Sequence, residues 1–291
     1  MPLLASIDIG SNTIRLLIGK IKDNTIIEVF SGRKITRLAD GINQTGILKD
    51  ENIEASIAVL KEFSSIVSRH RVKYVKAVAT SALREAYNSD IFIKRVFADT
   101  GISIEVISGE KEAELILKGI LSSLPDSSPI THQSTLVIDI GGGSTEWILC
   151  KDKHLVDMGS IPIGVIKLAR SFIKTDPVSD TDIAELNRKI VSFLDELKIR
   201  IVQYIDRYTL FIGTAGTFTT IASIDLKLDT YSREKIHLYR IPLSRLRDIS
   251  RRLLALPLKE RKKVRGLEPE RADLIIPGIQ FAIRVMEFFE F

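Results

Sequence analysis

Cysteine, histidine and tryptophan are scarce in this sequence of 291 residues. The single cysteine, Cys150, excludes an internal disulfide and is typical of a protein in a reducing compartment. The four histidines show none of the spacings that zinc sites use, so we expect them at the surface or in packing. No Walker sequence, Ser-His-Asp order or G-x-S-x-G motif is present, and the sequence therefore does not indicate a P-loop NTPase or a serine hydrolase.

Long apolar runs are also absent. No run approaches the roughly 20 residues that a membrane-spanning helix needs. The N-terminal segment MPLLASIDIG has no basic region and leads directly into a predicted strand, so we expect no signal peptide. An apolar fraction of 45% and a charged fraction of 27% are those of a soluble globular protein. We therefore expect no membrane partner and a cytoplasmic location.

Positive charge is in excess, with a formal net charge of +5. The simpler interpretation is a solvated basic surface, and the alternative is a polyanionic partner. Cations concentrate in residues 245–265, here called the basic segment, whose only acids are Asp248 and Glu260. Its cations are Arg245, Arg247, Arg251, Arg252, Lys259, Arg261, Lys262, Lys263 and Arg265. Nucleic acid, phospholipid headgroups and polyphosphate would all suit such a segment.

Short β-branched runs alternate with helical patterns along the whole chain, which predicts an α/β protein. The predicted strands cover residues 3–10, 14–21, 25–30, 73–80, 103–107, 136–140, 146–150, 155–163 and 209–213. In the first half, the predicted helices begin near residues 51, 81, 88 and 108. In the second half, the predicted helices cover residues 180–206, 244–256 and 272–289, and one more begins after residue 213. An Asp-Asn pair at residues 23–24 predicts a turn between two strands.

A polar, proline-bearing segment without periodicity, residues 122–133, is the best candidate for a domain boundary. We therefore predict a first domain over residues 1–124 and a second over 125–278. The last helix, about 279–291, is expected to pack back on the first domain.

The chain contains an internal repeat. IDIGSNTIRLLI begins at Ile7 and IDIGGGSTEWIL begins at Ile138, and each lies at the head of its half. Both copies read strand, aspartate, glycine turn, hydroxyl and return strand. Two similar α/β halves with a cleft between them are the structural hypothesis.

The turn of the second copy lacks side chains where it would approach a ligand. Gly141, Gly142 and Gly143 allow close approach of backbone N–H groups to an anion, and Ser144 and Thr145 add hydroxyl donors. The simpler interpretation is a β-hairpin turn, in which glycine is common. A hairpin does not require three consecutive glycines between two acids, and we favour a phosphate site.

A carboxylate beside a phosphate site would repel the ligand unless a cation lies between them. Asp139 and Glu146 lie on either side of the turn and could converge on one magnesium ion, Mg²⁺, with manganese, Mn²⁺, as the alternative. In the first copy, Asp8 either assists the metal or shapes the turn. Arg15 stands where the second copy has Glu146, so one half presents a cation and the other an acid. Ser11, Asn12 and Arg15 are the candidate phosphate contacts of this first turn.

A third glycine turn joins a predicted strand to a helix at residues 212–222. Gly213, Thr214, Gly216 and Thr217 form its Gly-Thr-x-Gly-Thr core, and helix N-termini favour anions. A capped strand-to-helix turn explains the same residues, and the local pattern does not separate the two interpretations.

The helix that begins near Ser108 carries a candidate general base. Glu112 precedes the apolar stripe and leans toward its buried side, where a carboxylate could act as a base. Its alternative role is to serve the helix dipole, which explains Glu110 well. Arg84 follows a strand end and could bind phosphate oxygens in a fork, although a surface helical arginine is the simpler interpretation.

Seven segments, in this order, resemble the exopolyphosphatase / guanosine pentaphosphate phosphohydrolase family. They are IDIGSNTIRLLIG, VATSALREA, VISGEKEAELILKGI, LVIDIGGGSTEWIL, GSIPIG, FIGTAGTFTTIA and GLEPERADLIIPG. The resemblance implies the two-domain actin-like ATPase (RNase H-like) fold, duplicated halves with a cleft between them. The chain resembles the short, two-domain members, which puts processive action on very long chains in doubt.

Roles follow from the resemblance motif by motif. It implies that Glu112 is the catalytic base and that Asp139 and Glu146 handle magnesium. Phosphate-contacting positions are implied at Asn12, Arg84 and Ser144, with Gly141 to Gly143. Lys111 stands where members often have another glutamate, and Ala215 replaces a frequent glycine of the third turn.

These observations together predict an exopolyphosphatase that removes the terminal phosphate of inorganic polyphosphate. Guanosine pentaphosphate is the nearest rival substrate, and no residue separates the two. An actin-like or sugar-kinase-type ATP-binding protein would need an adenosine pocket. A nucleic-acid-binding protein would leave Glu112 and the glycine turns unexplained. The basic segment is expected to steer polyphosphate, and a homodimer is expected by analogy alone.

Overall fold

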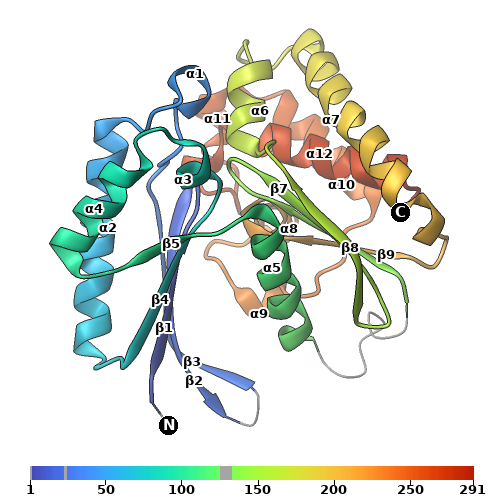
Figure 1. The fold of residues 1–291 in the computed structure, drawn as a ribbon. Helices are drawn as coiled ribbons and strands as arrows, with labels where there is room; N and C mark the ends of the chain where they lie inside the picture. The colour runs from blue at the N-terminus through green and yellow to red at the C-terminus, as the bar shows by residue number, and fades with distance from the viewer. Residues whose placement is uncertain (1, 23–24, 125–132) are drawn as a thin grey trace. The chain divides into compact units, whose positions relative to one another are not determined.

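The computed structural model covers the whole chain and describes residues 2–22, 25–124 and 133–291. The chain divides into two compact units, Met1–Ser122 and Ser123–Phe291, so the division falls two residues before the predicted boundary. The predicted turn at residues 23–24 and most of the predicted boundary segment, 122–133, lie outside the described residues. Each unit is an α/β body with its own sheet and core (Figure 1).

The first unit is built on a five-stranded sheet in the order β3-β2-β1-β4-β5. Its strands are β1 (Leu4–Ile9), β2 (Thr13–Lys22), β3 (Thr25–Ile35), β4 (Tyr74–Ala79) and β5 (Ile104–Val106). β2 runs antiparallel to both neighbours, and β1, β4 and β5 run parallel. The carboxyl ends of the three parallel strands therefore share one edge, where ligands of such sheets bind.

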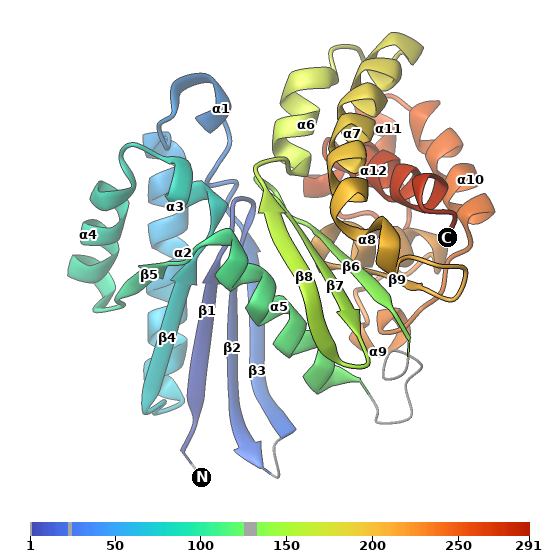
Figure 2. The same cartoon turned by 45° about the vertical axis from the view of Figure 1, so that its right-hand side comes forward.

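Helices cover both faces of this sheet. They are α1 (Ile42–Thr45), α2 (Asp50–Arg69), α3 (Ser81–Glu85), α4 (Ser89–Thr100) and α5 (Gly109–Ser123). α2 and α4 lie on one face and α5 on the other (Figures 1 and 2). The core lies under α2 and α4, where alternate strand residues such as Ile7, Leu16 and Ala77 meet Phe63 and Phe92.

The second unit has a four-stranded sheet in the order β8-β7-β6-β9. Its strands are β6 (Thr135–Ile140), β7 (Thr145–Lys151), β8 (His154–Ile161) and β9 (Leu210–Thr214). β7 is antiparallel to β6 and β8, and β9 is parallel to β6. The second sheet thus repeats the first: a hairpin leads, and a strand parallel to its first member follows after a helical crossover.

The repeat predicted from the sequence is confirmed in the pairing of residues. Asp8 lies opposite Arg15 in the first hairpin, and Asp139 lies opposite Glu146 in the second. The α/β class and the duplicated halves are confirmed with it, and the strand order of the first unit is that of the RNase H-like domain of actin-like ATPases.

The second unit is rich in helix. Its helices are α6 (Val165–Phe172), α7 (Asp180–Ile201), η2 (Val202–Tyr204), α8 (Ala215–Asp225), α9 (Arg233–Ile236), α10 (Leu243–Leu254), α11 (Leu258–Arg261), η3 (Pro269–Arg271) and α12 (Ile275–Phe288). α7 was predicted to reach residue 206, but it ends at Ile201 and η2 follows. Among the described residues, no helix has both the length and the apolarity to cross a membrane.

The expectation that the last helix packs on the first domain is wrong. α12 lies inside the second unit, where Phe281 and Val285 join the core formed with β6, β7 and α7. Ile276 and Ile279 join a second core with α8 and α10. Most residues of α12 are buried, as in a core helix, and α12 packs against other helices of its own unit.

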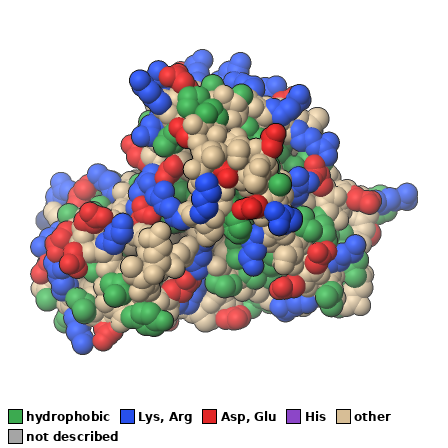
Figure 3. All heavy atoms as spheres, turned by 90° about the horizontal axis from the view of Figure 1, so that it is seen from above, with side chains coloured by type: hydrophobic (Ala, Val, Ile, Leu, Met, Phe, Trp, Pro, Cys, Tyr) green, Lys and Arg blue, Asp and Glu red, His purple; other side chains and the backbone are tan. Residues whose placement is uncertain are grey.

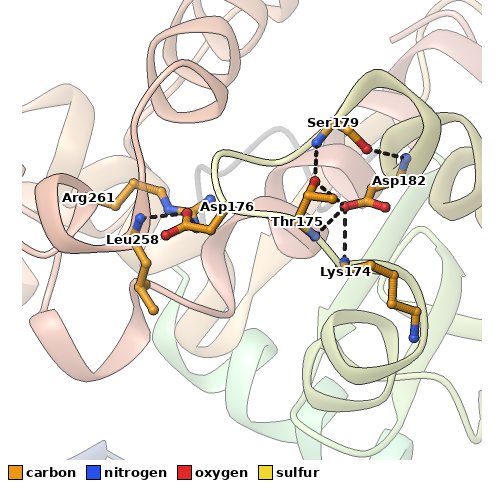
Figure 4. Close-up of polar contacts among 7 residues, drawn as sticks. All are labelled: Lys174, Thr175, Asp176, Ser179, Asp182, Leu258 and Arg261. Carbon is orange, nitrogen blue, oxygen red and sulfur yellow. Dashed lines mark hydrogen bonds and ion pairs between the residues drawn. The ribbon is translucent and has the colours of Figure 1, made fainter.

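A network of hydrogen bonds fixes the start of α7 (Figure 4). Ser179 Oγ accepts from the N–H of Asp182, as expected of a helix cap. Asp182 Oδ2 accepts from the N–H groups of Lys174 and Thr175 at 3.0 and 2.9 Å, and from Thr175 Oγ1 at 2.8 Å. Burial works to raise the pKa of Asp182, but these hydrogen bonds prevail and hold it below the usual value. Asp182 therefore stabilises the loop before the helix as well as the helix start.

Candidate phosphate-hydrolysis site

The two hairpin turns close in the same way. Gly10 N–H donates to the Thr13 carbonyl at 3.1 Å, and Gly141 N–H donates to the Ser144 carbonyl at 3.0 Å. A Cβ atom added at Gly10 or Gly141 would lie 3.1 or 3.0 Å from that same carbonyl oxygen. A side chain would be crowded at the first position of each turn because the chain folds back tightly there, so glycine is favoured.

Helix α6 holds the carbonyl side of the second turn. Val165 N–H donates to the Gly141 carbonyl at 3.0 Å, and Ile166 N–H donates to the Gly142 carbonyl at 2.9 Å. The N–H groups of Gly142 and Gly143 donate to no group among the described residues. The turn thus has its acceptors satisfied and successive donors available, which is the arrangement of an anion nest.

The first turn is held by the chain that follows β3. Ala39 N–H donates to the Ser11 carbonyl, and the N–H groups of Thr36 and Arg37 both donate to the Asn12 carbonyl. The Asn12 side chain is buried, and its Oδ1 has no hydrogen-bond partner within the described part of the chain. A buried acceptor in this state is normally satisfied by water. The Nδ2 group, whose only hydrogen bond among the described residues is a long one of 3.5 Å to Thr13 Oγ1, is the part of Asn12 that could donate to phosphate.

The carboxylates of the second hairpin lie on directly opposed residues of β6 and β7. Asp139 pairs with Glu146 in the ladder, so both side chains are on the same face. Glu146 is fully buried and accepts a hydrogen bond from Ser160 Oγ at 2.7 Å. Two carboxylates beside a phosphate seat fit Mg²⁺, which takes one or two protein carboxylates together with phosphate oxygens. No group of three His, Cys, Asp or Glu side chains among the described residues could hold a metal alone.

The first hairpin has opposite charges at the matching positions. Arg15 Nη1 lies 3.6 Å from Asp8 Oδ2. Burial raises the pKa of Asp8, and the charge of Arg15 works against that rise. Asp8 therefore has a cationic partner within its own hairpin, an arrangement that favours its role in shaping the site.

Glu112 and Arg84 meet at the edge of the first sheet. Arg84 Nη1 donates to Glu112 Oε2 at 2.8 Å and to the Ile107 carbonyl at 2.9 Å. Both side chains are mostly buried, with exposed fractions of 22% for Arg84 and 18% for Glu112. The sequence singled out both residues but not their contact, because α3 follows β4 and α5 follows β5. Only the parallel pairing of those strands brings the two helices together.

The other charges of α5 are engaged elsewhere. Ser108 Oγ caps the helix by accepting from Lys111 N–H. Hydrogen bonds from its own backbone N–H and from Ser108 lower the pKa of Glu110, in keeping with a first-turn acid. Glu114 binds both Lys111 and Lys118, which lowers its pKa to about 2. Lys111 therefore faces Glu114 and leaves Glu112 to Arg84.

The third turn is more constrained than its sequence suggests. Thr214 precedes α8, and Ala215 has a φ of 63°, the left-handed region that favours glycine. The Thr217 hydroxyl donates to the Ile140 carbonyl of β6 at 3.0 Å, and the Thr145 hydroxyl donates to the Ile163 carbonyl at 2.5 Å. These two candidate phosphate donors thus have acceptors inside the unit and hold the turns in place.

Arg271 was not singled out in the sequence, although it lies in the motif GLEPERADLIIPG. Its guanidinium packs against the third turn, where a Cβ atom added at Gly216 would lie 2.5 Å from Nη1. Its Nε donates to Glu268 Oε2 at 2.9 Å, and its side chain is only 11% exposed. A buried arginine in contact with a glycine turn is a candidate for anion binding. The signal that could have found it is its place in GLEPERADLIIPG, one of the seven segments that carry the resemblance.

Comparison with known proteins identifies the family. The Ppx/GppA phosphatase family matches residues 17–291. This chain belongs to that family. It is 31% identical to exopolyphosphatase 2 of Mycobacterium tuberculosis, over 94% of this chain and 87% of that protein. The crystal structure of an exopolyphosphatase from Cytophaga hutchinsonii superposes with a TM-score of 0.90 at 29% identity, covering 98% of this chain and 90% of that one.

Other relatives of this Ppx/GppA protein are longer. A bifunctional 3-dehydroquinate synthase/phosphatase of Fusobacterium nucleatum is 33% identical over 99% of this chain, which spans 43% of that protein. A guanosine-5'-triphosphate,3'-diphosphate pyrophosphatase of Vibrio vulnificus is 26% identical over 99% of this chain, which spans 55% of that protein. The chain thus spans about half the length of some curated relatives and most of the length of others.

In the folded protein, acidic side chains offset much of the positive charge of the basic segment. Most of its cations form ion pairs: Arg245 with Asp225, Arg247 with Glu287, Arg251 with Asp248, Arg261 with Asp176, Lys263 with Glu260 and Arg265 with Asp229. On the face drawn in Figure 3, Lys and Arg side chains are interspersed with Asp and Glu. These pairs give the segment a structural role, and its support for steering a polyanion is weaker than the sequence suggested.

Proposed function

We propose that this protein hydrolyses the terminal phosphoanhydride bond of inorganic polyphosphate, releasing orthophosphate. The observation that carries the proposal is the contact between Arg84 and Glu112, which puts a cation and a carboxylate at the carboxyl edge of the first sheet. Membership of a phosphatase family and the likeness to exopolyphosphatase 2 support the same reaction. We expect the reaction to take place in the cytoplasm.

Glu112 acts as the general base in this proposal. Its contact with Arg84 orients the carboxylate, and a carboxylate can accept a proton. As the water oxygen bonds to phosphorus, Glu112 takes a proton from that water and the bond to the bridging oxygen breaks. The shortened chain leaves with that oxygen. Cys150 is not a nucleophile in this scheme, because burial raises the pKa of its thiol to about 11.

Each unit carries groups that can bind phosphate. In the second unit the N–H groups of Gly142 and Gly143 are neutral donors. In the first unit the Asn12 side chain is a further donor, and Arg84 supplies positive charge. Phosphoryl transfer needs mainly positioning and electrostatic stabilisation, and these groups provide both.

Asp139 and Glu146 would hold Mg²⁺, or Mn²⁺ in its place. When bound there, the ion would neutralise phosphate oxygens that two carboxylates would otherwise repel. The fit rests on the direct pairing of the two residues across β6 and β7.

Guanosine pentaphosphate is the second candidate substrate. The observation that favours it is the likeness over 99% of this chain to a guanosine-5'-triphosphate,3'-diphosphate pyrophosphatase. The bond cleaved would again be a terminal phosphoanhydride, so the same residues would act.

The test compares phosphate release from polyphosphates of defined length with release from guanosine pentaphosphate, each with and without Mg²⁺. We expect faster release from polyphosphate and loss of activity on chelation. Glu112→Gln is expected to lower kcat roughly 10²- to 10⁴-fold. Glu114→Gln, which changes an exposed acid of the same helix, is the matched control and is expected to retain activity. A loss of less than about tenfold in Glu112→Gln would remove Glu112 from the role of base.

A further inference from the structure

Three helices of the second unit meet at Gly278 of α12. A Cβ atom added there would lie 2.5 Å from the methyl carbon of Thr217 in α8 and 3.4 Å from a methyl carbon of Val165 in α6. Gly278 is buried, and α12 packs against both of those helices. Glycine inside a helix is less stable than alanine, so a packing or functional reason is expected for it. The reason here is close approach, because α12 lies against the starts of α6 and α8.

The two neighbours of Gly278 each hold part of the second turn. Val165 N–H donates to the Gly141 carbonyl at 3.0 Å. The Thr217 hydroxyl donates at 3.0 Å to the carbonyl of Ile140, the residue before that glycine. Gly278 therefore contacts the two residues that fix the chain where β6 ends and the turn begins. The next two N–H groups along the chain are the donors proposed to bind phosphate.

The segment that leads into α12 makes two more contacts with the same elements. The Arg271 guanidinium packs against Gly216 of the third turn. Asp273 Oδ2 lies 3.7 Å from Nη2 of Arg170 in α6. Residues 271–278, here called the strap, thus contact the third turn and α6 at two points each. The strap joins the third turn to the helix that holds the second.

The Thr217 side chain cannot move away from α12 without releasing its hydrogen bond. Its methyl and hydroxyl groups are attached to the same Cβ atom, so a rotation that moved the methyl would also turn the hydroxyl away from the Ile140 carbonyl. The alternative is a shift of α8 or α12, which would displace the third turn. A side chain in place of Gly278 would therefore disturb the end of β6 in either case.

We propose that Gly278 is a positioning residue for the phosphate seat of the second turn, and that the strap holds the second and third turns in register. Gly278 does not touch substrate in this scheme. It acts through Thr217 and Val165, whose hydrogen bonds hold the chain in front of the donor N–H groups. The inference rests on the proposed function for the ligand of the seat, but its structural part is measured without turnover.

Nuclear magnetic resonance of the isotope-labelled protein observes the donor groups directly. The amide signals of Gly142 and Gly143 are followed while orthophosphate is titrated into the whole chain with Mg²⁺ present. We expect Gly278→Ala to move both signals and to weaken orthophosphate binding by roughly tenfold or more. Ile279→Val, which removes a methyl group from the buried next residue of the same helix, is the control. It should lower Tm by roughly 2–4 °C and leave the signals and the affinity unchanged.

A double-mutant cycle tests whether the effect passes through Thr217. Thr217→Ser keeps the hydroxyl and deletes the methyl carbon that the new Cβ of Gly278→Ala would meet. In the Thr217→Ser background, Gly278→Ala should therefore change the affinity for orthophosphate by no more than about twofold. Equal effects of Gly278→Ala in the two backgrounds would overturn the role. Amide signals that Gly278→Ala leaves in place would overturn it too, as would equal weakening of orthophosphate by Ile279→Val.

If Gly278→Ala does not fold, Thr217→Val decides. It keeps the shape of the side chain and loses the hydroxyl, so it releases the Ile140 carbonyl without crowding. Displaced amide signals and weaker orthophosphate binding in Thr217→Val support the role, and unchanged signals and affinity refute it.

Phosphate release separates this inference from the proposed function. The expected pattern of signals and affinities in a protein that releases no phosphate from polyphosphate or guanosine pentaphosphate would uphold the positioning role and refute the proposed function. Rates of phosphate release that Gly278→Ala leaves unchanged would refute the positioning role and uphold the function.

Discussion

Arg84 donates hydrogen bonds from one nitrogen to both Glu112 Oε2 and the Ile107 carbonyl. Ile107 follows β5 and Glu112 lies in the first turn of α5, so the arginine fixes the helix start to the strand end. The carboxylate is thereby held by a neighbour from a different strand-helix unit. Its orientation does not depend on α5 alone.

Substitution of Arg84 tests this arrangement. Arg84→Lys keeps the positive charge but loses the planar guanidinium, whose remaining N–H groups could fork onto phosphate oxygens while Nη1 holds Glu112 and Ile107. We expect kcat to fall roughly 10²- to 10³-fold. Arg95→Lys is the control, because Arg95 forms a comparable pair with Glu54 away from this edge, and it should leave kcat unchanged. Steady-state kinetics on tripolyphosphate decides, and equal activity of the two variants would contradict the role of Arg84.

Gly164 tests the seat formed by the second turn. Its backbone is extended, with a φ of −128°, so alanine is conformationally acceptable there. A Cβ atom would nevertheless lie 2.4 Å from the Gly142 carbonyl carbon and oxygen, and 2.6 Å from the nitrogen of Gly143. We expect Gly164→Ala to displace the turn and lower kcat/KM at least about tenfold.

Gly119→Ala is the matched control for Gly164→Ala. An added Cβ has no neighbour within 4 Å at this exposed position of α5. The control should keep full activity and gain about 0.5–1 kcal/mol of stability, since alanine is the better helix former. An active Gly164→Ala protein would show that the turn tolerates displacement and does not hold the phosphate.

The sequence predicted the class and the duplicated hairpins because their signals are local. Ile7 to Ile18 and Ile138 to Leu149 each contain the whole hairpin, so register follows from the positions of Asp8 and Asp139. The packing of α12 could not be predicted from the sequence of that helix alone. The sequence pattern predicted a helix there, but it did not identify the neighbours of that helix, which are α7, α8 and α10.

Side-chain partners were harder to predict than side-chain roles. Arg84 and Glu112 were named separately, yet their contact requires the parallel pairing of β4 with β5. Arg271 was missed for the same reason, because it meets the third turn only through packing of a segment remote in sequence. For the basic segment, the sequence overestimated the available positive charge. Its acidic partners, such as Asp225 and Glu287, lie on other segments of the chain.

Asp182 gives a prediction about pH. Its pKa is held below the usual value of 3.8 in the folded state, so its contribution to stability is complete above that value and is lost as the pH falls through the folded pKa. At neutral pH, Asp182→Ala should lower the free energy of unfolding by about 1–3 kcal/mol, because three hydrogen bonds lose their acceptor.

Urea unfolding at neutral pH and again near pH 3 measures this effect. The difference between wild type and Asp182→Ala should shrink at the lower pH. Asp180→Ala removes an exposed acid from the same helix turn and should cost much less. A difference that is equal at both pH values would mean that packing of the side chain, not its ionised oxygens, accounts for the loss.

Ala215 gives a prediction about strain. Its φ of 63° destabilises the folded state by about 1 kcal/mol for alanine but not for glycine. Glycine, however, loses more chain entropy on folding. Ala215→Gly should therefore be neutral or slightly stabilising. Ala222→Gly, buried in the same helix, should instead lose at least about 1 kcal/mol. Thermal melts of the two variants provide the comparison, and a clear loss in Ala215→Gly would show that the methyl group itself is needed for packing.

The identical closure of the two hairpins bears on how the halves diverged. Each turn is shut by one bond between main-chain atoms, so nothing in that closure depends on whether the return strand carries Arg15 or Glu146. Ancestral halves of equal chemistry could acquire opposite electrostatic character through substitutions on a scaffold that stayed unchanged. A doubled ancestor with the same residue in both places would then be a viable protein, and reconstructing it would reveal what a symmetric version of this enzyme can bind.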